Sequence, residues 1–395
     1  MGKAQMKLIV GSPVSGESFF GRDREVKKLT GKILEGRNIY ISAPRRIGKT
    51  SLMKHVFDQL ISLGHTCFWI DVEGCTSPAN FAGELFGVIY AQANKNKFEK
   101  LVHHFKKIGK NIGSGANSDI TQIIKGIFGS ASWQTETKTQ LEELAGQNEG
   151  PIFIFIDELG ILLQRLLSAG ESGETEALDL LTWLREVCQK LSGTVCFIIA
   201  SSVGIPSLLY RYNLSGHLNH FESFPLFPWD TSIAQAFIKL VFDSYGILFD
   251  DEAPAVMTGL LGECSPFFVQ LYTDTLVDDA KLRLEDQPGF TVNGNFCREV
   301  FSSPQMHEKG KIQLNHLVER LRRSQSEEDV ELAMQILSAV AKNKDGVSKS
   351  LINNSEKGKM NLVNMLVDDG YIKAEKDKYI FPSNYLREWW NARYG

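Results

Sequence analysis

Several features that mark other protein classes are missing from this sequence, and each absence excludes something. The six cysteines of the 395-residue chain form no C-x-x-C pair, which favours free thiols over a zinc site or a disulfide framework. No apolar run reaches the roughly 18 residues that a membrane-spanning helix needs. The first residues, "MGKAQMKLIVGSP", lack the long apolar core of a signal peptide. We therefore expect a cytoplasmic protein with no membrane partner.

A strong charge of one sign is missing as well. The chain has 43 Lys and Arg against 47 Asp and Glu, a formal net charge of −4, so its total charge is not that of a nucleic-acid binder. It contains no internal repeat and no low-complexity tract. The hydrophobic content of 43% is ordinary for a globular protein. A chain of this length is expected to form two or three domains.

Short apolar runs alternate with amphipathic segments over residues 17–250, which is the α/β pattern. We predict strands at residues 38–43, 66–72, 151–157, 194–202 and 223–229. The first four are almost wholly apolar, which predicts a parallel sheet covered by helices on both faces. An insertion at about 95–148 contains a basic stretch and then a Gly/Ser-rich stretch. It is either a solvated loop or a surface for a partner or nucleic acid.

Helical patterns replace strand patterns after residue 230. We divide the chain into an α/β core at 1–230, a helical segment at 231–325 and a C-terminal segment at 326–395. The charged run at 322–331 is either a helix start or a short linker. The last segment shows helix, short helix, helix and a two-strand hairpin, which is the element order of a winged helix. Residues 335–395 carry ten Lys and Arg against seven Asp and Glu, so this segment could contact DNA or dock a protein.

The stretch "APRRIGKT", residues 43–50, lies between a predicted strand and an amphipathic helix. A phosphate-binding loop needs this context, because its backbone N–H groups and the dipole of the following helix hold the phosphates together. Lys49 would reach the β- and γ-phosphates, and Thr50 would bind Mg²⁺. Ala43 replaces the usual first glycine, but the phosphate-facing part is intact. The predicted nucleotide contacts in this stretch are Pro44, Arg45, Arg46, Ile47, Gly48, Lys49, Thr50 and Ser51.

A second motif follows about a hundred residues later, where "PIFIFIDELG" is an apolar strand that ends in Asp157 and Glu158. Asp157 is placed to bind Mg²⁺. Glu158 is placed to polarise an attacking water, which favours hydrolysis over phosphoryl transfer to a metabolite. The two motifs together predict an ATP–Mg²⁺ site.

Other positions leave alternatives open. Ser201 or Ser202, at the end of the fourth strand, either contacts the γ-phosphate and water or only forms a turn. Arg45 and Arg46 face phosphate, solvent or a neighbouring subunit.

Five stretches together resemble a known family: "FFGRDREVKKL", "APRRIGKTSL", "FIDEL", "IIASS" and "GECSPFFVQLYTDTL". They are similar to AAA+/STAND-like P-loop ATPases, in particular to the archaeal-type predicted ATPases related to origin-recognition ATPases. The resemblance covers roughly residues 17–285, and a lid and winged helix extend it to the end. It implies a sheet ordered 5-1-4-3-2, with ATP at the carboxyl ends of the strands and with 231–325 as the lid.

The resemblance also implies that Phe20, Gly21 and Arg22 lie against the adenine and that Pro266 packs on its other side. From residue type alone, Phe20 and Pro266 could equally be core residues. The resemblance places Arg211 in the region of the arginine that acts on a neighbouring subunit, although Arg211 could equally form a surface ion pair. Ser265 stands between Cys264 and Pro266 where the family often has G-x-P. The implied activity is that of a molecular switch that binds and hydrolyses ATP, is slow without its partner and forms an ATP-dependent homo-oligomer. The alternatives are a DNA-binding regulator or a protein-docking scaffold in which ATP only sets the oligomeric state.

Overall fold

The computed structural model describes residues 6–92, 133–353 and 357–395. Most of the insertion predicted at 95–148 therefore lies outside the described residues. The described part of the chain forms two compact units. The sheet unit consists of Val26–Ser42 and Val56–Pro225. The helical unit consists of the chain up to Glu25 together with Ala43–His55 and Leu226–Gly395.

The sheet unit is built on a parallel sheet, which has five strands within the described residues. They are β1 (Asn38–Ser42), β2 (Thr66–Asp71), β3 (Ile152–Asp157), β4 (Val195–Ala200) and β5 (Phe221–Pro225). Their order is β2-β3-β4-β1-β5, which confirms the predicted order 5-1-4-3-2. Every residue of β3 and β4 is buried, as expected for central strands with helices on both faces.

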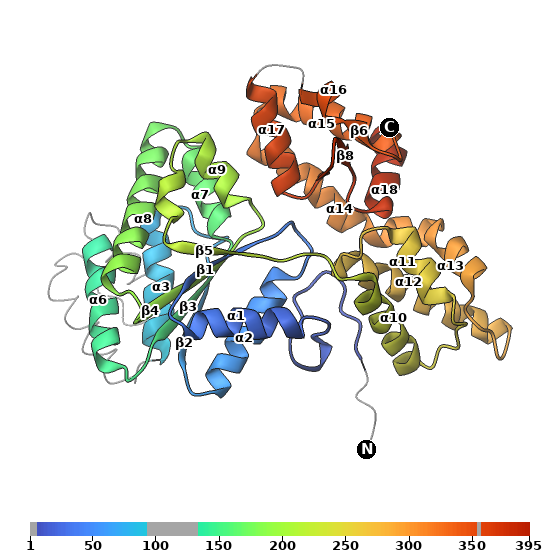
Figure 1. Cartoon of the computed structure of the whole chain (residues 1–395), viewed down its shortest axis with the longest axis horizontal. Coiled ribbons are helices and arrows are strands. Elements are labelled where there is room, and N and C mark those ends of the chain that lie inside the picture. The colour runs from blue at the N-terminus through green and yellow to red at the C-terminus, as the bar shows by residue number, and fades with distance from the viewer. Residues whose placement is uncertain (1–5, 93–132, 354–356) are drawn as a thin grey trace, which may run out of the picture. The chain divides into compact units, whose positions relative to one another are not determined.

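Helices cover both faces of this sheet (Figure 1). They are α1 (Asp23–Leu34), α2 (Lys49–Ser62), α3 (Pro78–Gln92), α6 (Trp133–Gln147), α7 (Leu159–Leu167), α8 (Glu171–Lys190) and α9 (Ile205–Arg211). On the α2 side, Phe57 packs edge-on against Trp69 and Phe155. On the α8 side, Trp183 packs against Phe81 and Phe197. Aromatic side chains therefore fasten helices to both faces of the sheet.

The fifth strand is the clearest error in the predicted boundaries, because β5 ends at Pro225 rather than at residue 229. Proline has no N–H to donate to a sheet ladder, so pairing stops there. Trp229 donates its backbone N–H instead to the carbonyl of Cys264, at 3.0 Å. Trp229, predicted as the end of the fifth strand, is thus bonded within the helical unit and not to the sheet.

The register of the strands sets which residues meet at the carboxyl edge of the sheet. Asp157 pairs with Ala200, and Ala200 pairs with Ile41 on the other side. With strands about 4.8 Å apart, the end of β3 lies roughly 10 Å from the end of β1. The loop that begins at Ala43 leaves β1 at this same edge.

The helical unit contains the helical segment predicted at 231–325. Its helices are α10 (Thr231–Tyr245), α11 (Ala253–Leu261), α12 (Pro266–Asp286), α13 (Gly294–Phe301) and α14 (Pro304–Ser324). A short 3-10 turn, η1 (Gly16–Ser18), precedes α1 in the N-terminal part. Asn293 and Ser303 cap α13 and α14, because their side-chain oxygens accept from backbone N–H groups of the first turn.

The C-terminal segment follows after a two-residue break, and Ser326 caps its first helix. The charged run at 322–331 therefore covers the end of α14, this break and the start of the next helix. Its helices are α15 (Glu327–Lys342), α16 (Lys349–Asn353), α17 (Lys357–Asp368) and α18 (Asn384–Tyr394). Its strands are β6 (Val347–Ser348), β7 (Lys373–Glu375) and β8 (Lys378–Ile380). Among the described residues they form an antiparallel sheet ordered β6-β8-β7. The hairpin was predicted, whereas β6 was not.

A continuous apolar core joins the helical and C-terminal segments. It extends from Met6 through Phe268 of α12 to Tyr385 and Trp390 of α18. Trp389 and Trp390 are both buried, so both pack in the core. All six cysteines lie within the described residues and are buried thiols. Among the described helices, none combines the length and the apolar composition that crossing a bilayer requires.

Candidate nucleotide site

The loop between β1 and α2 has the backbone shape of an anion-binding loop. Arg46 and Gly48 both adopt left-handed backbone conformations, with φ of 67° and 95°. The Lys49 ammonium donates to the carbonyls of Ala43 at 2.7 Å and Pro44 at 2.8 Å. These two bonds hold the start of the loop against the beginning of α2. Lys49, the residue predicted to reach the phosphates, therefore links the two ends of the loop.

The inner side of this loop offers hydrogen-bond donors. Within the described ranges, no group accepts a hydrogen bond from the N–H of Ile47, Gly48 or Thr50. Such N–H groups at the start of a helix bind anions readily, because they are unsatisfied and lie at the positive end of the helix dipole. The loop can therefore hold phosphate oxygens.

Arg22 contacts the same loop from outside. Its side chain is buried, and it donates to the carbonyl of Ile47 at 3.0 Å and to the carboxylate of Glu25 at 2.8 Å. Burial lowers the pKa of the Arg22 guanidinium, and the charge of Glu25 opposes that shift. The Ser51 hydroxyl, one turn into α2, accepts from the N–H of Val14 at 3.0 Å. The N-terminal part of the chain thus braces the loop and the first turn of α2.

The two other predicted residues of the Phe-Gly-Arg stretch lie in an aromatic cluster. Phe20 packs against Trp229 and Phe237, with ring centroids 6.0 Å and 5.5 Å apart. Gly21 has no space for a side chain, because a Cβ there would lie 2.6 Å from Ile233. The structure therefore gives both residues packing partners in the helical unit.

Arg45 and Arg46 lie beside the helical and C-terminal segments. The Arg46 carbonyl accepts from the Ser265 hydroxyl at 2.9 Å, and its guanidinium lies 4.0 Å from the ring centre of Phe267. Pro266, the first residue of α12, stands between these two partners and is buried. Arg45 is near Tyr371: burial raises the pKa of the Tyr371 hydroxyl, and the charges of Arg320 and Arg45 oppose that rise. The sequence predicted that Arg46 faces phosphate, solvent or a neighbouring subunit. The structure shows that it contacts Ser265 and Phe267 of its own chain.

The sheet unit holds the predicted carboxylates at the end of β3. The Asp157 carboxylate accepts from the N–H of Glu158 at 3.1 Å. Glu158 has a left-handed backbone, with φ of 62°. Its Oε2 atom accepts from the N–H and the hydroxyl of Ser202, both at 2.8 Å, and from the Ser201 hydroxyl at 3.4 Å. The ends of β3 and β4 are therefore joined through the glutamate that was predicted to polarise water.

These contacts separate the two serines that the sequence left as alternatives. Ser202 makes the two shorter bonds to Glu158, whereas Ser201 also accepts from the N–H of Val203 at 3.0 Å and so forms a turn. Arg211 is the last residue of α9, between β4 and β5, and it is exposed. Ser265 and Phe267 were not predicted as part of the site. The departure of Ser265 from the family's G-x-P pattern is the signal that could have found it.

Comparison with solved structures identifies this arrangement. A Walker-type ATPase of Pyrococcus abyssi matches with a TM-score of 0.63 and 17% identity, over 96% of this chain and 97% of that one. The ORC2 protein of Aeropyrum pernix, solved as ADPNP–ADP complexes, matches with a TM-score of 0.53 and 13% identity, over 94% and 93% of the two chains. The chain shares the P-loop ATPase fold of these two proteins. No family model matches the chain, and no curated protein matches it.

The two residues predicted to bind Mg²⁺ belong to different units, Thr50 to the helical unit and Asp157 to the sheet unit. No group of three or more His, Cys, Asp or Glu side chains that could hold a metal occurs in the described part of the chain. One hydroxyl and one carboxylate fit Mg²⁺, because this ion keeps several waters and completes its shell with phosphate oxygens. The donors present therefore fit a metal that arrives with the nucleotide.

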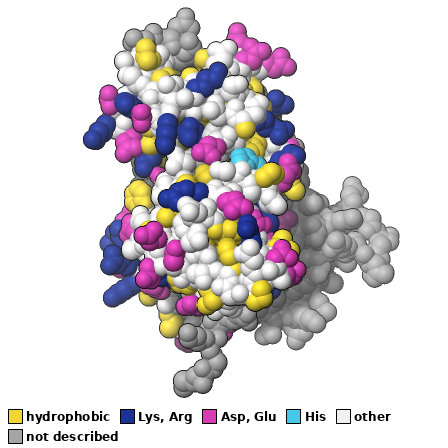
Figure 2. Space-filling view, turned by 90° about the vertical axis from the view of Figure 1, so that its right-hand side faces the viewer, with side chains coloured by type: hydrophobic (Ala, Val, Ile, Leu, Met, Phe, Trp, Pro, Cys, Tyr) yellow, Lys and Arg dark blue, Asp and Glu magenta, His cyan; other side chains and the backbone are white. Residues whose placement is uncertain are grey.

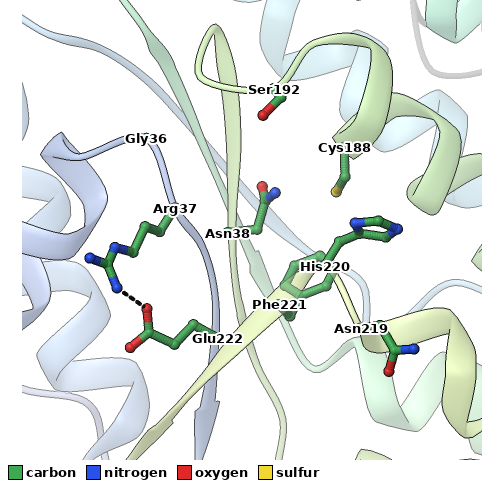
Figure 3. A pocket seen from close by; sticks show the side chains of 9 residues that line it. All are labelled: Gly36, Arg37, Asn38, Cys188, Ser192, Asn219, His220, Phe221 and Glu222. Atoms are coloured by element: carbon green, nitrogen blue, oxygen red, sulfur yellow. Dashed lines mark hydrogen bonds and ion pairs between the residues drawn. The ribbon is translucent and has the colours of Figure 1, made fainter.

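The P-loop fold also has a hollow at the opposite edge of its sheet, where β1 and β5 begin (Figure 3). It has a volume of about 360 Å³. Its lining is mostly polar and consists of Gly36, Arg37, Asn38, Cys188, Ser192, Asn219, His220, Phe221 and Glu222. Arg37 and Glu222 form an ion pair of 2.8 Å on one side of it (Figure 3). Since nucleotides bind at the carboxyl ends of strands in such sheets, this hollow is distinct from the predicted ATP site.

Proposed function

We propose that the chain is an ATP-binding and ATP-hydrolysing molecular switch of the AAA+/STAND-like type. Mg-ATP turnover would rearrange the lid, residues 231–325, and a C-terminal winged helix, residues 326–395, and so control the engagement of a partner. The observation that carries this proposal is the loop of residues 43–50, whose N–H groups at Ile47, Gly48 and Thr50 are available to phosphate.

ATP binding follows from the chemistry of that loop. The N–H groups of the loop and the dipole of α2 attract the phosphates, and the Lys49 ammonium neutralises their negative charge. Thr50 and Asp157 would be the ligands of a Mg²⁺ ion, which would neutralise negative charge on the phosphates. Phe20, Gly21, Arg22 and Pro266 remain the proposed neighbours of the base, as the family resemblance implies. Phe20 and Gly21 would contact the base while they pack in the aromatic cluster with Trp229 and Phe237.

Hydrolysis is assigned to Glu158 because its carboxylate is held at the carboxyl edge of the sheet. Oε2 is fixed by Ser202 and Ser201, and among the described residues none donates to Oε1. Oε1 would therefore accept from the attacking water. Arg211 is exposed and would act on the nucleotide of a neighbouring copy, so we propose an ATP-dependent homo-oligomer and slow turnover without it.

The C-terminal segment supports the partner-binding part of the proposal. Its order of helices and its three described strands is that of a winged helix, and Asn361 and Asn364 of α17 are exposed. On the face that Figure 2 shows, Lys and Arg side chains are interspersed with Asp and Glu side chains. A duplex needs a more continuous basic surface. We therefore place a protein partner ahead of DNA for this face.

The direct test is ATP binding by the Lys49→Ala variant. We expect the purified chain to bind Mg-ATP in calorimetry and Lys49→Ala to lose that binding, because the loop then lacks its charge and its two bonds to Ala43 and Pro44. Lys54→Ala, a matched substitution one turn further along α2, should keep the wild-type affinity. If Lys49→Ala and the wild type bound ATP with equal affinity, the proposed ATP site would be wrong. If duplex DNA stimulated the ATPase activity and bound in a salt-sensitive manner, the proposed partner would be DNA rather than a protein.

A further inference from the structure

Two successive peptide groups of the phosphate loop are held by side chains from elsewhere in the helical unit. The carbonyl of Arg46 accepts from the Ser265 hydroxyl at 2.9 Å. The carbonyl of Ile47 accepts from the Arg22 guanidinium at 3.0 Å. Neither donor belongs to the loop, since Ser265 immediately precedes α12 and Arg22 immediately precedes α1.

These bonds determine the direction of the donors that face a phosphate. In a trans peptide the C=O and the following N–H point in opposite directions and lie in one plane. Fixing the carbonyl of Arg46 therefore fixes the N–H of Ile47, and fixing the carbonyl of Ile47 fixes the N–H of Gly48. Both N–H groups are among those that no described residue accepts from.

The side chain of Arg46 lies against Phe267 of α12. Its guanidinium lies 4.0 Å from the ring centre of Phe267, two residues after Ser265. Burial, with the charge of Arg45, lowers the pKa of Arg46 to about 10. Its backbone φ of 67° is unusual for a residue with a side chain. Strained conformations of this kind persist only where the surroundings hold them.

Ser265 stands at the N-terminal cap position of α12 but donates its hydroxyl to the loop. Ser265 occupies the position before the first residue of α12, where a serine side chain usually accepts from the backbone of the helix. Here its side chain makes no such bond, and its hydroxyl donates to the loop instead. The interruption of the G-x-P pattern thus coincides with a contact to the loop.

We propose that Ser265, Arg22 and Arg46 are positioning residues that set the N–H groups of Ile47 and Gly48 for phosphate, in place of the missing first glycine. Ser265 and Arg22 act through the loop carbonyls, and Arg46 acts by stacking on Phe267 rather than by binding phosphate. The ATP affinity of the loop then depends on residues at the start of α12. This inference rests on the proposed ATP binding.

The test compares two serines that stand before helices. Ser265→Ala should weaken Mg-ATP binding roughly fivefold, the equivalent of one hydrogen bond, with little change in Tm. Ser326→Ala removes a true cap, since Ser326 accepts from Asp329 at 3.2 Å; it should lower Tm and leave ATP affinity unchanged. Equal ATP affinity of Ser265→Ala and wild type would overturn the role of Ser265.

A second pair of variants separates the backbone of Arg46 from its guanidinium. Both variants remove the guanidinium and its stacking on Phe267. They differ in the backbone, because Arg46→Gly keeps the left-handed conformation accessible, whereas Arg46→Ala disfavours it. We expect Arg46→Gly to bind ATP more tightly than Arg46→Ala. If the guanidinium were a phosphate ligand, both variants would lose affinity equally, and that result would overturn the assignment.

Hydrogen exchange distinguishes failure of this inference from failure of the proposed function. Without nucleotide, amides of residues 43–50 should exchange faster in Ser265→Ala than in wild type and Ser326→Ala. If the wild-type chain binds no ATP but shows this difference, the proposed function fails and the bracing of the loop stands. If the exchange rates are equal, the bracing itself is wrong.

Discussion

Gly370 lies directly against Pro44. A Cβ built on Gly370 would be 2.4 Å from the Cβ of Pro44, far inside van der Waals contact. Gly370 ends α17 with a left-handed φ of 80°, and the next residue, Tyr371, donates to the carbonyl of Leu317 at 2.8 Å. The turn after α17 is thus anchored on α14 and touches the phosphate loop at the residue that follows the missing glycine.

This contact makes Gly370→Ala more harmful than a similar change elsewhere. Gly246, at the end of α10, has a comparable φ of 68°, but a Cβ there would meet nothing within 4 Å. Gly246→Ala should cost about 1 kcal/mol of unfolding free energy, from backbone strain alone. Gly370→Ala should cost about 2–4 kcal/mol, because overpacking against Pro44 adds to that strain. Urea unfolding of the two variants measures the difference.

A compensating change checks that Pro44 is responsible. Pro44→Gly removes the atoms that the new Cβ would meet, so Pro44→Gly combined with Gly370→Ala should lose less stability than the two single changes added together. Strict additivity would show that Gly370→Ala acts only through backbone strain. In that case the contact between Gly370 and Pro44 would make no contribution to the free energy of unfolding.

Glu158→Gln should abolish ATP hydrolysis and keep ATP bound. The amide keeps the size of the side chain and an oxygen for Ser202, but it removes the negative charge that polarises the attacking water. We expect kcat to fall at least about a hundredfold, within the range that general-base catalysis supplies, and the ATP Kd to stay within about threefold. Steady-state ATPase assays and calorimetry check both values. Normal turnover in this variant would remove the role given to Glu158.

Ser202→Ala should have a smaller and more selective effect than Glu158→Gln. The variant loses the hydroxyl bond to Oε2 but keeps the bond from the Ser202 N–H, each 2.8 Å long in the wild type. We expect kcat to fall about five- to tenfold, as for the loss of one charge-assisted hydrogen bond, with KM unchanged. Ser202→Thr, which retains a hydroxyl, should recover part of the rate. A rise in KM without a fall in kcat would assign Ser202 to binding instead.

The fold and the two motifs could be predicted because their signals are local. An apolar strand, the eight residues "APRRIGKT" and an amphipathic helix stand next to each other in the sequence. Likewise, a buried strand is followed at once by Asp157 and Glu158. The sheet order came from the family resemblance, and the observed order confirms it. Local pattern and resemblance together were enough for the architecture.

The partners of the loop could not be predicted, because they lie far away in the sequence. Ser265 bonds to Arg46 across 219 positions, and Gly370 meets Pro44 over an even longer separation. Such pairs follow from how helices pack in the unit, and no spacing or periodicity encodes them. The same limit applies to Ser202, whose distance from Glu158 depends on the register between β3 and β4. For Arg46, the residue type shows a positive charge but not the direction in which the side chain points.

The stability of the C-terminal segment should depend on pH through Asp368. The Asp368 side chain is exposed, but partial desolvation, together with the charge of Asp369, raises its pKa to about 6. In the unfolded chain an aspartate titrates near about 3.9. The folded state therefore binds more protons between these values, and this group's contribution to stability falls as pH rises from about 4 to about 6.

Replacing Asp368 should remove that pH dependence. Asp368→Asn should raise the unfolding free energy at pH 7 by about 1 kcal/mol or less, since solvent screens a partly exposed group. It should have little effect at pH 4. Asp377→Asn, in the turn between β7 and β8, controls for the loss of one negative charge. Thermal unfolding from pH 4 to pH 7 measures both variants. A gain that is equal at the two ends of that range would contradict the assignment.

The six buried cysteines should be unreactive in the folded protein. Burial raises the pKa of Cys67, Cys188 and Cys297 to about 12, and that of Cys196 and Cys264 to about 11. Since the thiolate is the reactive form, a thiol reagent at pH 8 should label fewer than one cysteine per chain within minutes. The same reagent should label all six after unfolding. Rapid labelling of one thiol in the native protein would contradict this. Cys188→Ala would then show whether the reactive thiol is the one that lines the hollow in Figure 3.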